Sequence, residues 1–384
     1  MLSFTPPGAI VQIIFRDTSG CSHYRLRWNA QYLAGLEQSG ITPILLPNPI
    51  LDPNWLAGTR CIFWQRPISD QDLAILTQLK GIQPKFGFKL VGEWDDLCWV
   101  SNGEFIPEYN MASLNMQNTD GMQKNMKRAL ELLDEVVVST EWLKDSIEKH
   151  FDYHAVRVIK NVVPRYLWSA ERKKPIESDL TKPTILYSGA PQHYRNPVPR
   201  CPQFPNGVEP HPGDWYPAWI DWIIQMVKLG KINFVIMGAL PYFFEPIKDL
   251  ITFIPWADCN TFPRTVMSIH ADFAIAPLAE NEFNRCKSDL RFLESCAIGA
   301  VFIGSDWPNS PYNVIHPDTK IPKDITLEQL NDKFNALCKK DNYNKVLDWQ
   351  YNYLNSTGRW LESNGHTNEF LAAFDNSQVL NPLI

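Results

Sequence analysis

A short stretch in the second half of the chain, "FNRCKSDLRFLESCAIGAVFIGS" (residues 283–305), combines residue types that bind anions and hydroxyl groups. Ser288 is the expected N-cap of an amphipathic helix, and Lys287 stands beside it. A helix start offers free backbone N–H groups and the positive end of the helix dipole, so Lys287 and Ser288 predict a phosphate pocket. Glu294 shares a helical face with Lys287, about 9 Å beyond the helix start, where it suits a pair of sugar hydroxyls. The spacing predicts nucleotide recognition, and the alternative is a capped surface helix with a Lys–Glu pair.

A second polar stretch, "DTSGCSHYR" (17–25), follows an apolar run near the start of the chain. Gly20 permits a tight turn and the close approach of a ligand, and His23 and Arg25 are candidates for polar contacts. The alternative is a purely structural turn. The stretch lacks G-x-G-x-x-G, so the fingerprint of a dinucleotide-binding protein is absent.

A third stretch, "GEWDD" (92–96), places two adjacent acids after another apolar run. We expect Asp95 or Asp96 to position an acceptor or to act as a base. Two such carboxylates can also hold Mn²⁺ or Mg²⁺, and a solvated acidic loop is the third interpretation.

Positive charge is concentrated between Arg157 and Arg200, although the whole chain carries −6. This segment has nine Lys or Arg and three acids, which gives +6 and leaves −12 for the remainder. Such a segment can serve a phosphorylated ligand or track a nucleic-acid backbone, and the alternative is a solvated charged face.

The elements that position these residues follow a repeated pattern of apolar runs and amphipathic segments. In the first half we predict strands at 10–15, 41–46, 60–65, 86–92, 135–139 and 155–159, and helices at about 23–39, 69–80, 121–133 and 141–150. In the second half we predict strands at 184–189, 233–238, 251–255, 273–278 and 300–305, and helices near 214–229, 260–269 and 288–298. Strands that alternate with helices imply parallel sheets with helices on both faces, so two Rossmann-like, doubly wound α/β domains are expected.

The polar, proline-containing stretch 161–183 is typical of a linker between the two sheets. We therefore predict an N-terminal domain over 1–165, a C-terminal domain over 166–345, and C-terminal helices over 346–384 that pack back toward the N-terminal domain. Residues 189–217 contain eight prolines, which neither a helix nor a regular strand tolerates, so they predict a long irregular loop. Ligands of doubly wound sheets bind at the carboxyl ends of strands, where this loop begins.

The composition is that of a globular protein with more than one domain, with 384 residues of which 45% are hydrophobic. We expect no transmembrane helix and no signal peptide, because no run of about 18 apolar residues and no cationic leader is present. Eight cysteines without a CxxC pair favour reduced thiols, no zinc site and a cytoplasmic location.

The block "IAPLAENEFNRCKSDLRFLESCAIGAVFIGSD" (275–306) resembles the donor-binding signature of GT-B glycosyltransferases of the retaining, family 4-like type. Weaker matches follow in order along the chain, and the resemblance spans about residues 10–310. The matching segments are "IIFRDTSGCSHYRLRWNAQYLAGLEQSG" (13–40), "KLVGEWDDLCW" (89–99), "EVVVSTEWLKDSI" (135–147), "VIKNVVP" (158–164) and "ILYSGAPQHYRNP" (185–197). The pattern is also similar to glycosyltransferases encoded by bacteriophages, some of which modify DNA.

The resemblance implies a GT-B fold, with the acceptor on the N-terminal domain and a nucleotide-diphosphate sugar on the C-terminal domain. It implies donor contacts from Gly20, Gly189, His193, Arg195, Asn284, Lys287, Ser288 and Glu294, and acceptor contacts from Arg25 and Glu93. Catalytic roles are expected for Asp95, Asp96, His23 and Lys287, with no metal and no cofactor other than the donor itself. Many members carry a second Glu eight positions before the ribose Glu, where this chain has Cys286, so Glu282 or Asn284 is expected to supply sugar contacts.

These observations predict a metal-independent, retaining glycosyltransferase that acts on an acceptor hydroxyl. The basic segment favours a hydroxymethylated pyrimidine in phage DNA as the acceptor. A cell-surface glycan or lipid is the first alternative, and a nucleotide-sugar-binding protein without turnover is the second.

Overall fold

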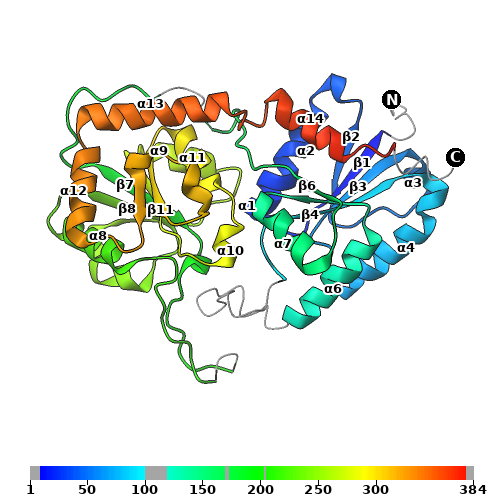
Figure 1. Cartoon of the computed structure of the whole chain (residues 1–384), viewed down its shortest axis with the longest axis horizontal. Helices are drawn as coiled ribbons and strands as arrows, with labels where there is room; N and C mark the ends of the chain where they lie inside the picture. The colour runs from blue at the N-terminus through cyan, green and yellow to red at the C-terminus, as the bar shows by residue number, and fades with distance from the viewer. Residues whose placement is uncertain (1–8, 100–118, 169–172, 203–204, 378–384) are drawn as a thin grey trace.

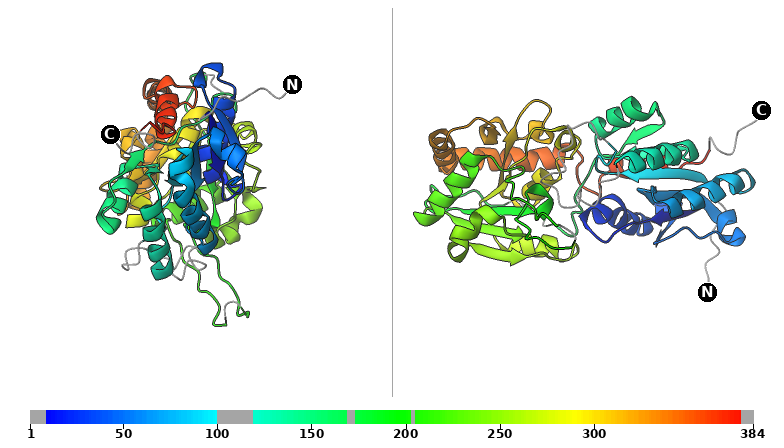
Figure 2. Two further views of the ribbon diagram at one scale, coloured as in Figure 1. Left: turned by 90° about the vertical axis from the view of Figure 1, so that its right-hand side faces the viewer. Right: turned by 90° about the horizontal axis from the view of Figure 1, so that it is seen from below.

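The computed structural model describes residues 9–99, 119–168, 173–202 and 205–377, which form two α/β domains side by side (Figures 1 and 2). Each domain is built on a six-stranded sheet, in the order β2-β1-β3-β4-β5-β6 in the first and β12-β11-β10-β7-β8-β9 in the second. Every pairing between neighbouring strands is parallel. The structure confirms the predicted fold class of two doubly wound sheets.

The strands lie close to their predicted positions. The first sheet contains β1 (Ile10–Ile14), β2 (Thr42–Leu46), β3 (Thr59–Gln65), β4 (Lys89–Trp94), β5 (Glu135–Val138) and β6 (Val156–Val158). The second contains β7 (Thr184–Gly189), β8 (Asn233–Gly238), β9 (Thr252–Pro255), β10 (Phe273–Ala276), β11 (Val301–Asp306) and β12 (Lys320–Pro322). The sequence analysis missed β12, because three residues at a sheet edge give too short a pattern to recognise.

The helices of the first domain begin with an unusual one. Residues Gly20–Ala34 are helical throughout, as α1 (Gly20–Ser22), a π-helical turn η1 (His23–Arg27) and α2 (Trp28–Ala34). The others are α3 (Pro53–Gly58), α4 (Asp70–Phe86), α6 (Thr119–Leu132) and α7 (Glu141–Phe151). Local sequence fixes α4, whose N-cap Ser69 and third residue Asp72 form a capping box, and whose end is Gly87 in the left-handed conformation.

In the second domain the longer helices are α8 (Pro217–Lys228), α9 (Phe262–Ser268), α11 (Leu290–Ile298), α12 (Leu327–Leu337) and α13 (Lys340–Ser356). The last helix, α14 (Asn364–Ala373), crosses back and lies on the first domain (Figure 1). Its Phe370 and Phe374 pack among the buried residues of the first sheet, together with Val11 and Phe63. The predicted boundary at 345 falls inside α13. Val346 and Leu347 of this helix pack in the hydrophobic core of the second domain, so only the segment after α13 returns to the first domain.

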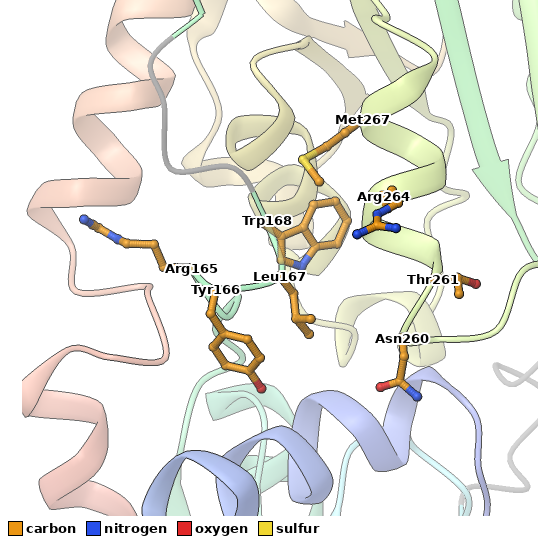
Figure 3. A pocket seen from close by; sticks show the side chains of 8 residues that line it. All are labelled: Arg165, Tyr166, Leu167, Trp168, Asn260, Thr261, Arg264 and Met267. Carbon is orange, nitrogen blue, oxygen red and sulfur yellow. The ribbon is translucent and has the colours of Figure 1, made fainter. Parts of the chain in front are cut away.

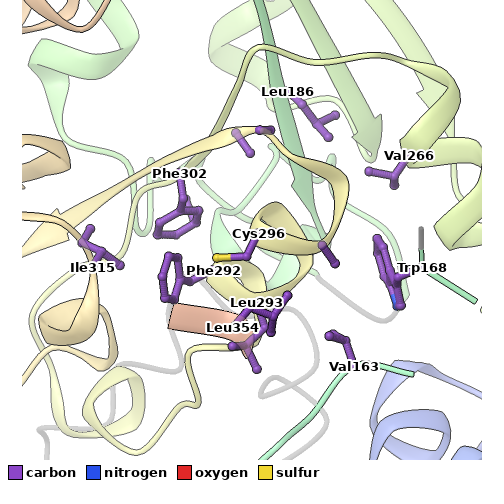
Figure 4. Close-up of a cluster of buried hydrophobic side chains, with 14 of the residues drawn as sticks. Val163, Trp168, Leu186, Val266, Phe292, Leu293, Cys296, Phe302, Ile315 and Leu354 are labelled. Carbon is purple, nitrogen blue, oxygen red and sulfur yellow. The ribbon is translucent and has the colours of Figure 1, made fainter. Parts of the chain in front are cut away.

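A hydrophobic cluster joins the domains through the linker (Figure 4). It contains Trp28 from α2, Trp168 from the linker, and Phe292 and Leu293 from α11. The helix of the predicted nucleotide signature is therefore packed on one side against residues of both domains.

The proline-rich segment leaves the carboxyl end of β7 and projects from the body of the protein (Figure 1). Its two arms are held by antiparallel bridges between Arg195 and His211 and between Val198 and Val208. The predicted long loop is thus an extended excursion that returns to its starting point before α8.

Among the described residues, no helix combines the length and the hydropathy that a bilayer crossing requires.

Candidate functional site

The predicted site residues lie at the carboxyl ends of the strands, near the point in each sheet where the strand order reverses. In the first sheet the chain reverses at β1 and β3, and in the second at β7 and β10. Ligands of doubly wound sheets bind in the crevice beside such a reversal. The loops after β1 and β4 supply Gly20 and Asp95, and the segment after β10 supplies Lys287.

The helix that carries Glu294 begins slightly later than predicted. Its N-cap is Asp289, not Ser288, and the Asp289 side chain makes no capping bond to the helix. Instead, Arg359 donates to both Asp289 carboxylate oxygens, at 3.0 and 2.6 Å, and its Nε donates to the carbonyl of Asn161 at 2.8 Å. The prediction of Ser288 as the N-cap was wrong, because the helix starts one residue later and the Ser288 hydroxyl oxygen accepts a hydrogen bond from Asn161 instead.

Lys287 reaches from this helix start to the other domain. Its Nζ lies 3.5 Å from Oδ1 of Asp96, which follows β4, and 4.4 Å from the centre of the Phe283 ring. Burial acts to lower the pKa of Lys287, but the carboxylates of Asp96 and Asp214 raise it above its usual value. The ammonium is therefore charged and lies where the two domains meet.

Asp95 is buried beside a second cation. Its Oδ1 lies 3.9 Å from Nε of Arg66, which follows β3 and also pairs with Asp17. Burial, and then the charge of Asp96, raises the pKa of Asp95. A carboxyl group with a raised pKa is suited to proton transfer.

Three side chains here could together offer ligands to a metal ion. The ligand atoms of Cys21, Asp95 and Asp96 lie within 4.8 Å of one another. Burial, and then the charge of the two acids, raises the pKa of Cys21, which favours the thiol over the metal-binding thiolate. Because Arg66 and Lys287 already balance the carboxylates, these residues fit a divalent cation poorly.

His23 is held by the residue that caps the start of its helix. Its Nδ1 lies 2.9 Å from the carbonyl of Ser19, and its ring packs edge-on against Trp28. A carbonyl only accepts, so Nδ1 donates this hydrogen bond. Gly20 begins the same helix, and a Cβ added there would meet nothing within 4 Å, so open space adjoins this turn.

Arg25 and Glu93 are buried and bonded to each other. Nε of Arg25 donates to Oε1 of Glu93 at 2.6 Å, and the two residues are 1% and 0% exposed. Burial raises the pKa of Glu93 to about 7, against the pull of Arg25. The expectation that these residues contact an acceptor finds no support in this geometry, because the pair lies inside the domain.

Arg25 instead connects to the predicted phosphate pocket. Its Nη1 donates to Oδ1 of Asn161 at 2.9 Å, and Nδ2 of Asn161 donates to Oγ of Ser288 at 2.7 Å. Ser288 thus accepts one hydrogen bond and keeps its own hydroxyl hydrogen for another partner. The chain Glu93–Arg25–Asn161–Ser288 links the first sheet to the start of α11.

Asp214, at the end of the proline-rich excursion, joins three segments of the second domain. Its Oδ2 lies 2.7 Å from Nδ1 of His193, while its Oδ1 accepts from Nδ2 of Asn284 at 2.7 Å and from the Ala279 amide at 3.1 Å. The second hydrogen of the Asn284 amide goes to the Ala279 carbonyl at 2.9 Å. Asn284 therefore positions the signature segment, and its side-chain amide has no N–H left for a sugar.

Arg195 and Gly189 take structural roles. Nε of Arg195 donates to the Glu209 carbonyl at 2.6 Å, so its side chain joins the two arms of the excursion. A Cβ at Gly189 would come within 2.2 Å of the Tyr187 hydroxyl, which explains glycine there through packing alone.

The segment around Cys286, which stands where many glycosyltransferases of this type carry a second Glu, makes contacts other than those expected. Cys286 is buried in the core of the first domain, and its carbonyl accepts from Oγ1 of Thr140 at 2.9 Å. Glu282 lies 3.8 Å from Nε2 of His150 on α7. This segment is therefore an interdomain contact, and Cys286 does not occupy a sugar-facing position.

Glu294 is engaged at both oxygens. Oε1 accepts from the Tyr24 hydroxyl at 2.6 Å, and Oε2 accepts from Nη1 of Arg291 at 2.8 Å. Nη1 of Arg291 also lies 3.4 Å from Oγ of Ser188, next to the carboxyl end of β7. Arg291 thus adds a second cation to the face that carries Lys287 and Glu294.

A cavity of about 530 Å³ lies away from these residues, between the linker and α9 (Figure 3). Its lining consists of Arg165, Tyr166, Leu167, Trp168, Asn260, Thr261, Arg264 and Met267. None of the predicted site residues is among them.

The sequence analysis missed Tyr24, Asp214, Arg66, Asn161, Arg291 and Arg359. A weak signal existed for Arg66, which directly follows a strand, and for Arg291, which shares the helical face of Lys287 and Glu294. The others act across long sequence separations, and periodicity in one segment carries no information about a partner in another.

Comparison with known proteins identifies the architecture. No protein-family model and no curated protein sequence matches the chain. Among solved structures, a glycosyltransferase from Rickettsia africae ESF-5 is similar with a TM-score of 0.56 and 12% identity, covering 97% of this chain and 99% of that one. Anabaena Alr3699/HepE in complex with UDP-glucose has a TM-score of 0.54 and 11% identity, covering 95% of this chain and 99% of that one. WaaG, a glycosyltransferase involved in lipopolysaccharide biosynthesis, has a TM-score of 0.53 and 11% identity, covering 95% of this chain and 98% of that one. Over nearly its whole length, the chain therefore has the GT-B fold of these glycosyltransferases.

Proposed function

We propose that this protein is a glycosyltransferase that moves a sugar from a nucleotide-diphosphate sugar to an acceptor hydroxyl. The observation that carries the proposal is the approach of Lys287 Nζ to Asp96 Oδ1, at 3.5 Å. A cation that can stabilise a leaving diphosphate thus lies next to an acidic loop that can position an acceptor hydroxyl. The similarity to Alr3699/HepE, whose structure contains UDP-glucose, supports the nucleotide-sugar donor.

In this proposal the donor lies along the signature helix. Lys287, the Ser288 hydroxyl and the first amides of α11 hold the diphosphate, and Glu294 holds the ribose. Asp95, Asp96 and His23 surround the sugar and the acceptor. The charge that develops on the departing diphosphate meets preorganised donors, which is where most of the rate acceleration arises.

Transfer with retention needs no protein nucleophile. The acceptor oxygen bonds to the anomeric carbon on the face that the diphosphate leaves. The bond from that carbon to the diphosphate oxygen breaks, its electron pair stays on that oxygen, and the same oxygen takes the acceptor proton. Lys287 stabilises the negative charge while the bond breaks.

Three classes of acceptor, namely glycans, lipids and modified DNA, are tested for this reaction. The comparisons give no support to a phage origin or to DNA as the acceptor. Within the described part of the chain, several charges of the basic segment already have partners: Arg157 pairs with Glu135, and Lys173 lies 3.6 Å from Asp272. Arg172 of the same segment lies outside the described residues. We keep modified DNA as one acceptor to test, beside glycans and lipids.

The test is release of nucleoside diphosphate from a panel of nucleotide sugars, with glycan, lipid and hydroxymethylated-DNA acceptors and mass spectrometry of the products. We expect turnover with one donor, unchanged by excess EDTA, because Lys287 and the helix start supply the charge a metal would otherwise provide. Activity lost in EDTA and restored by Mn²⁺ would make Asp95 and Asp96 metal ligands. Nucleotide binding without release for any acceptor would favour a non-catalytic binding protein.

A further inference from the structure

The carboxylate assigned to the donor ribose is already occupied by a residue of the opposite domain. The Tyr24 hydroxyl donates to Oε1 of Glu294 at 2.6 Å, and each of these residues is 6% exposed. Burial, and then the charge of Glu294, raises the pKa of Tyr24, so the phenol keeps its proton and acts as the donor of this bond. The contact is a strong, charge-assisted hydrogen bond between domains.

Little space is left beside this bond. The cavity that Glu294 lines together with Arg291, Ser188 and Phe262 measures about 20 Å³. That volume accommodates about one water molecule, whereas a ribose ring is several times larger. In this arrangement a ribose hydroxyl can bond to Oε1 of Glu294 only in place of the hydrogen bond from the Tyr24 hydroxyl.

The backbone that carries Tyr24 is itself irregular. Tyr24 lies in the π-helical turn η1, between α1 and α2. Such turns occur mostly as single insertions in α-helices and are frequent at functional sites. Tyr24, inside this turn, is the residue that contacts Glu294.

We propose that the Tyr24 hydroxyl and a hydroxyl of the donor ribose compete for Oε1 of Glu294. The inference rests on the proposed function, and it identifies Tyr24 as the residue that sets the affinity for the nucleotide. Arg291 stays on Oε2, so only one hydrogen bond is exchanged when the donor binds. Without the donor, Tyr24 supplies a hydrogen bond to Oε1 of Glu294, a buried oxygen that would otherwise have no partner.

The competition has an unusual consequence, because removing a native hydrogen bond should strengthen binding. In Tyr24→Phe the ring is kept and the hydroxyl is lost, so Oε1 of Glu294 has no partner until a ribose arrives. From the typical strength of a hydrogen bond to a charged group, we expect the nucleotide to bind tenfold to a hundredfold more tightly.

The matched control is Tyr32→Phe, on the same helix. The Tyr32 hydroxyl lies 3.5 Å from the Glu362 carbonyl and does not contact Glu294. Dissociation constants for UDP, GDP, ADP and CDP are measured by calorimetry on wild type and both variants. Melting temperatures are measured with and without the nucleotide that binds best. We expect Tyr32→Phe to bind as wild type does. Tyr24→Phe should melt lower than wild type without nucleotide and recover at saturation.

The outcomes separate the two ideas. If no nucleotide binds to wild type or to either variant, the proposed function fails. If wild type binds one and Tyr24→Phe binds it equally or more weakly, the competition is wrong while the donor site stands. Should Tyr24→Phe not fold, site-specific 3-fluorotyrosine at position 24 offers a stronger hydrogen-bond donor of nearly the same shape. It should weaken nucleotide binding, and unchanged or tighter binding would overturn the competition.

Discussion

Lys287 and Glu294 lie in one short run of sequence, but their surroundings separate their roles. Lys287 faces the acidic loop of the first domain, 3.5 Å from Asp96, whereas Glu294 is held by Tyr24 and Arg291. In the proposed reaction, negative charge grows near Lys287, and the ribose near Glu294 does not change. The two side chains should therefore contribute to different kinetic constants.

We expect Lys287→Ala to lower kcat on the order of 100-fold, about 3 kcal/mol, because it removes charge stabilisation that develops in the transition state. Glu294→Ala should raise the donor KM with kcat little affected, because it removes a contact made equally in both states. Steady-state kinetics with a ribonucleotide donor and its deoxyribose analogue separates them. The analogue should impair wild type but add little to Glu294→Ala. An unchanged donor KM in a folded Glu294→Ala protein would leave α11 as an ordinary packed helix.

At the scale of elements, Gly213 shows how a loop brings a distant carboxylate to the site. It has φ +63°, and a Cβ there would lie 2.2 Å from the His193 carbonyl oxygen, which is backbone and cannot give way. The amide of the next residue, Asp214, donates to that same carbonyl at 2.9 Å. The close approach of two backbones is what places Asp214 between His193 and Asn284.

We expect Gly213→Ala to lower the melting temperature and the turnover rate together, because the backbone shift displaces Asp214 from both partners. Gly230→Ala is the matched control, since Gly230 has φ +64° and nothing within 4 Å of an added Cβ. Both variants lose about 1–2 kcal/mol to the left-handed conformation, but only Gly213→Ala has the clash. Thermal melting and donor turnover of the two variants check this. Equal losses in both would mean that the approach to His193 is unimportant.

The elements also show which parts of the structure the sequence could predict. The strands and α11 were recognisable because each depends on a pattern within one segment, such as the apolar runs of β7 or β8. The N-cap of α11 was predicted one residue too early because the Ser288 hydroxyl bonds to Asn161, far away in the sequence, and no local pattern indicates that partner. Arg25 and Glu93 were read as ligand contacts for the same reason, since their mutual burial depends on how η1 packs against β4.

At the scale of the whole molecule, α14 adds a pH-sensitive contact to the first domain. His366 is 6% exposed, and its Nε2 lies 2.7 Å from Oδ1 of Asn29, an acceptor, so the ring donates from Nε2. Burial, followed by the charges of Arg25 and Arg359, lowers the pKa of His366 from 6.5 to about 3. The folded protein therefore holds this ring neutral where the unfolded chain would protonate it.

A depressed folded-state pKa gives stability that is complete above pH 6.5 and is lost as the pH falls toward 3. We expect the melting temperature of wild type to fall between pH 6.5 and 4.5 more steeply than that of His366→Gln, which has no group to protonate. His154→Gln is the control, because the His154 side chain is 69% exposed. Parallel pH profiles for wild type and His366→Gln would show that this ring does not couple folding to pH.

The return of α14 also bears on how the protein is made. Phe370, Ala373 and Phe374 complete the buried layer under β1 and β3, and Nζ of Lys89 donates to the Ala373 carbonyl at 3.1 Å. Domains generally fold as they leave the ribosome, beginning with the N-terminal one. Here the first domain emerges early, but one face of its sheet stays uncovered until α14, which follows the second domain in the chain, has been translated. The nascent first domain must therefore wait, with apolar surface uncovered, until the second domain has been synthesised.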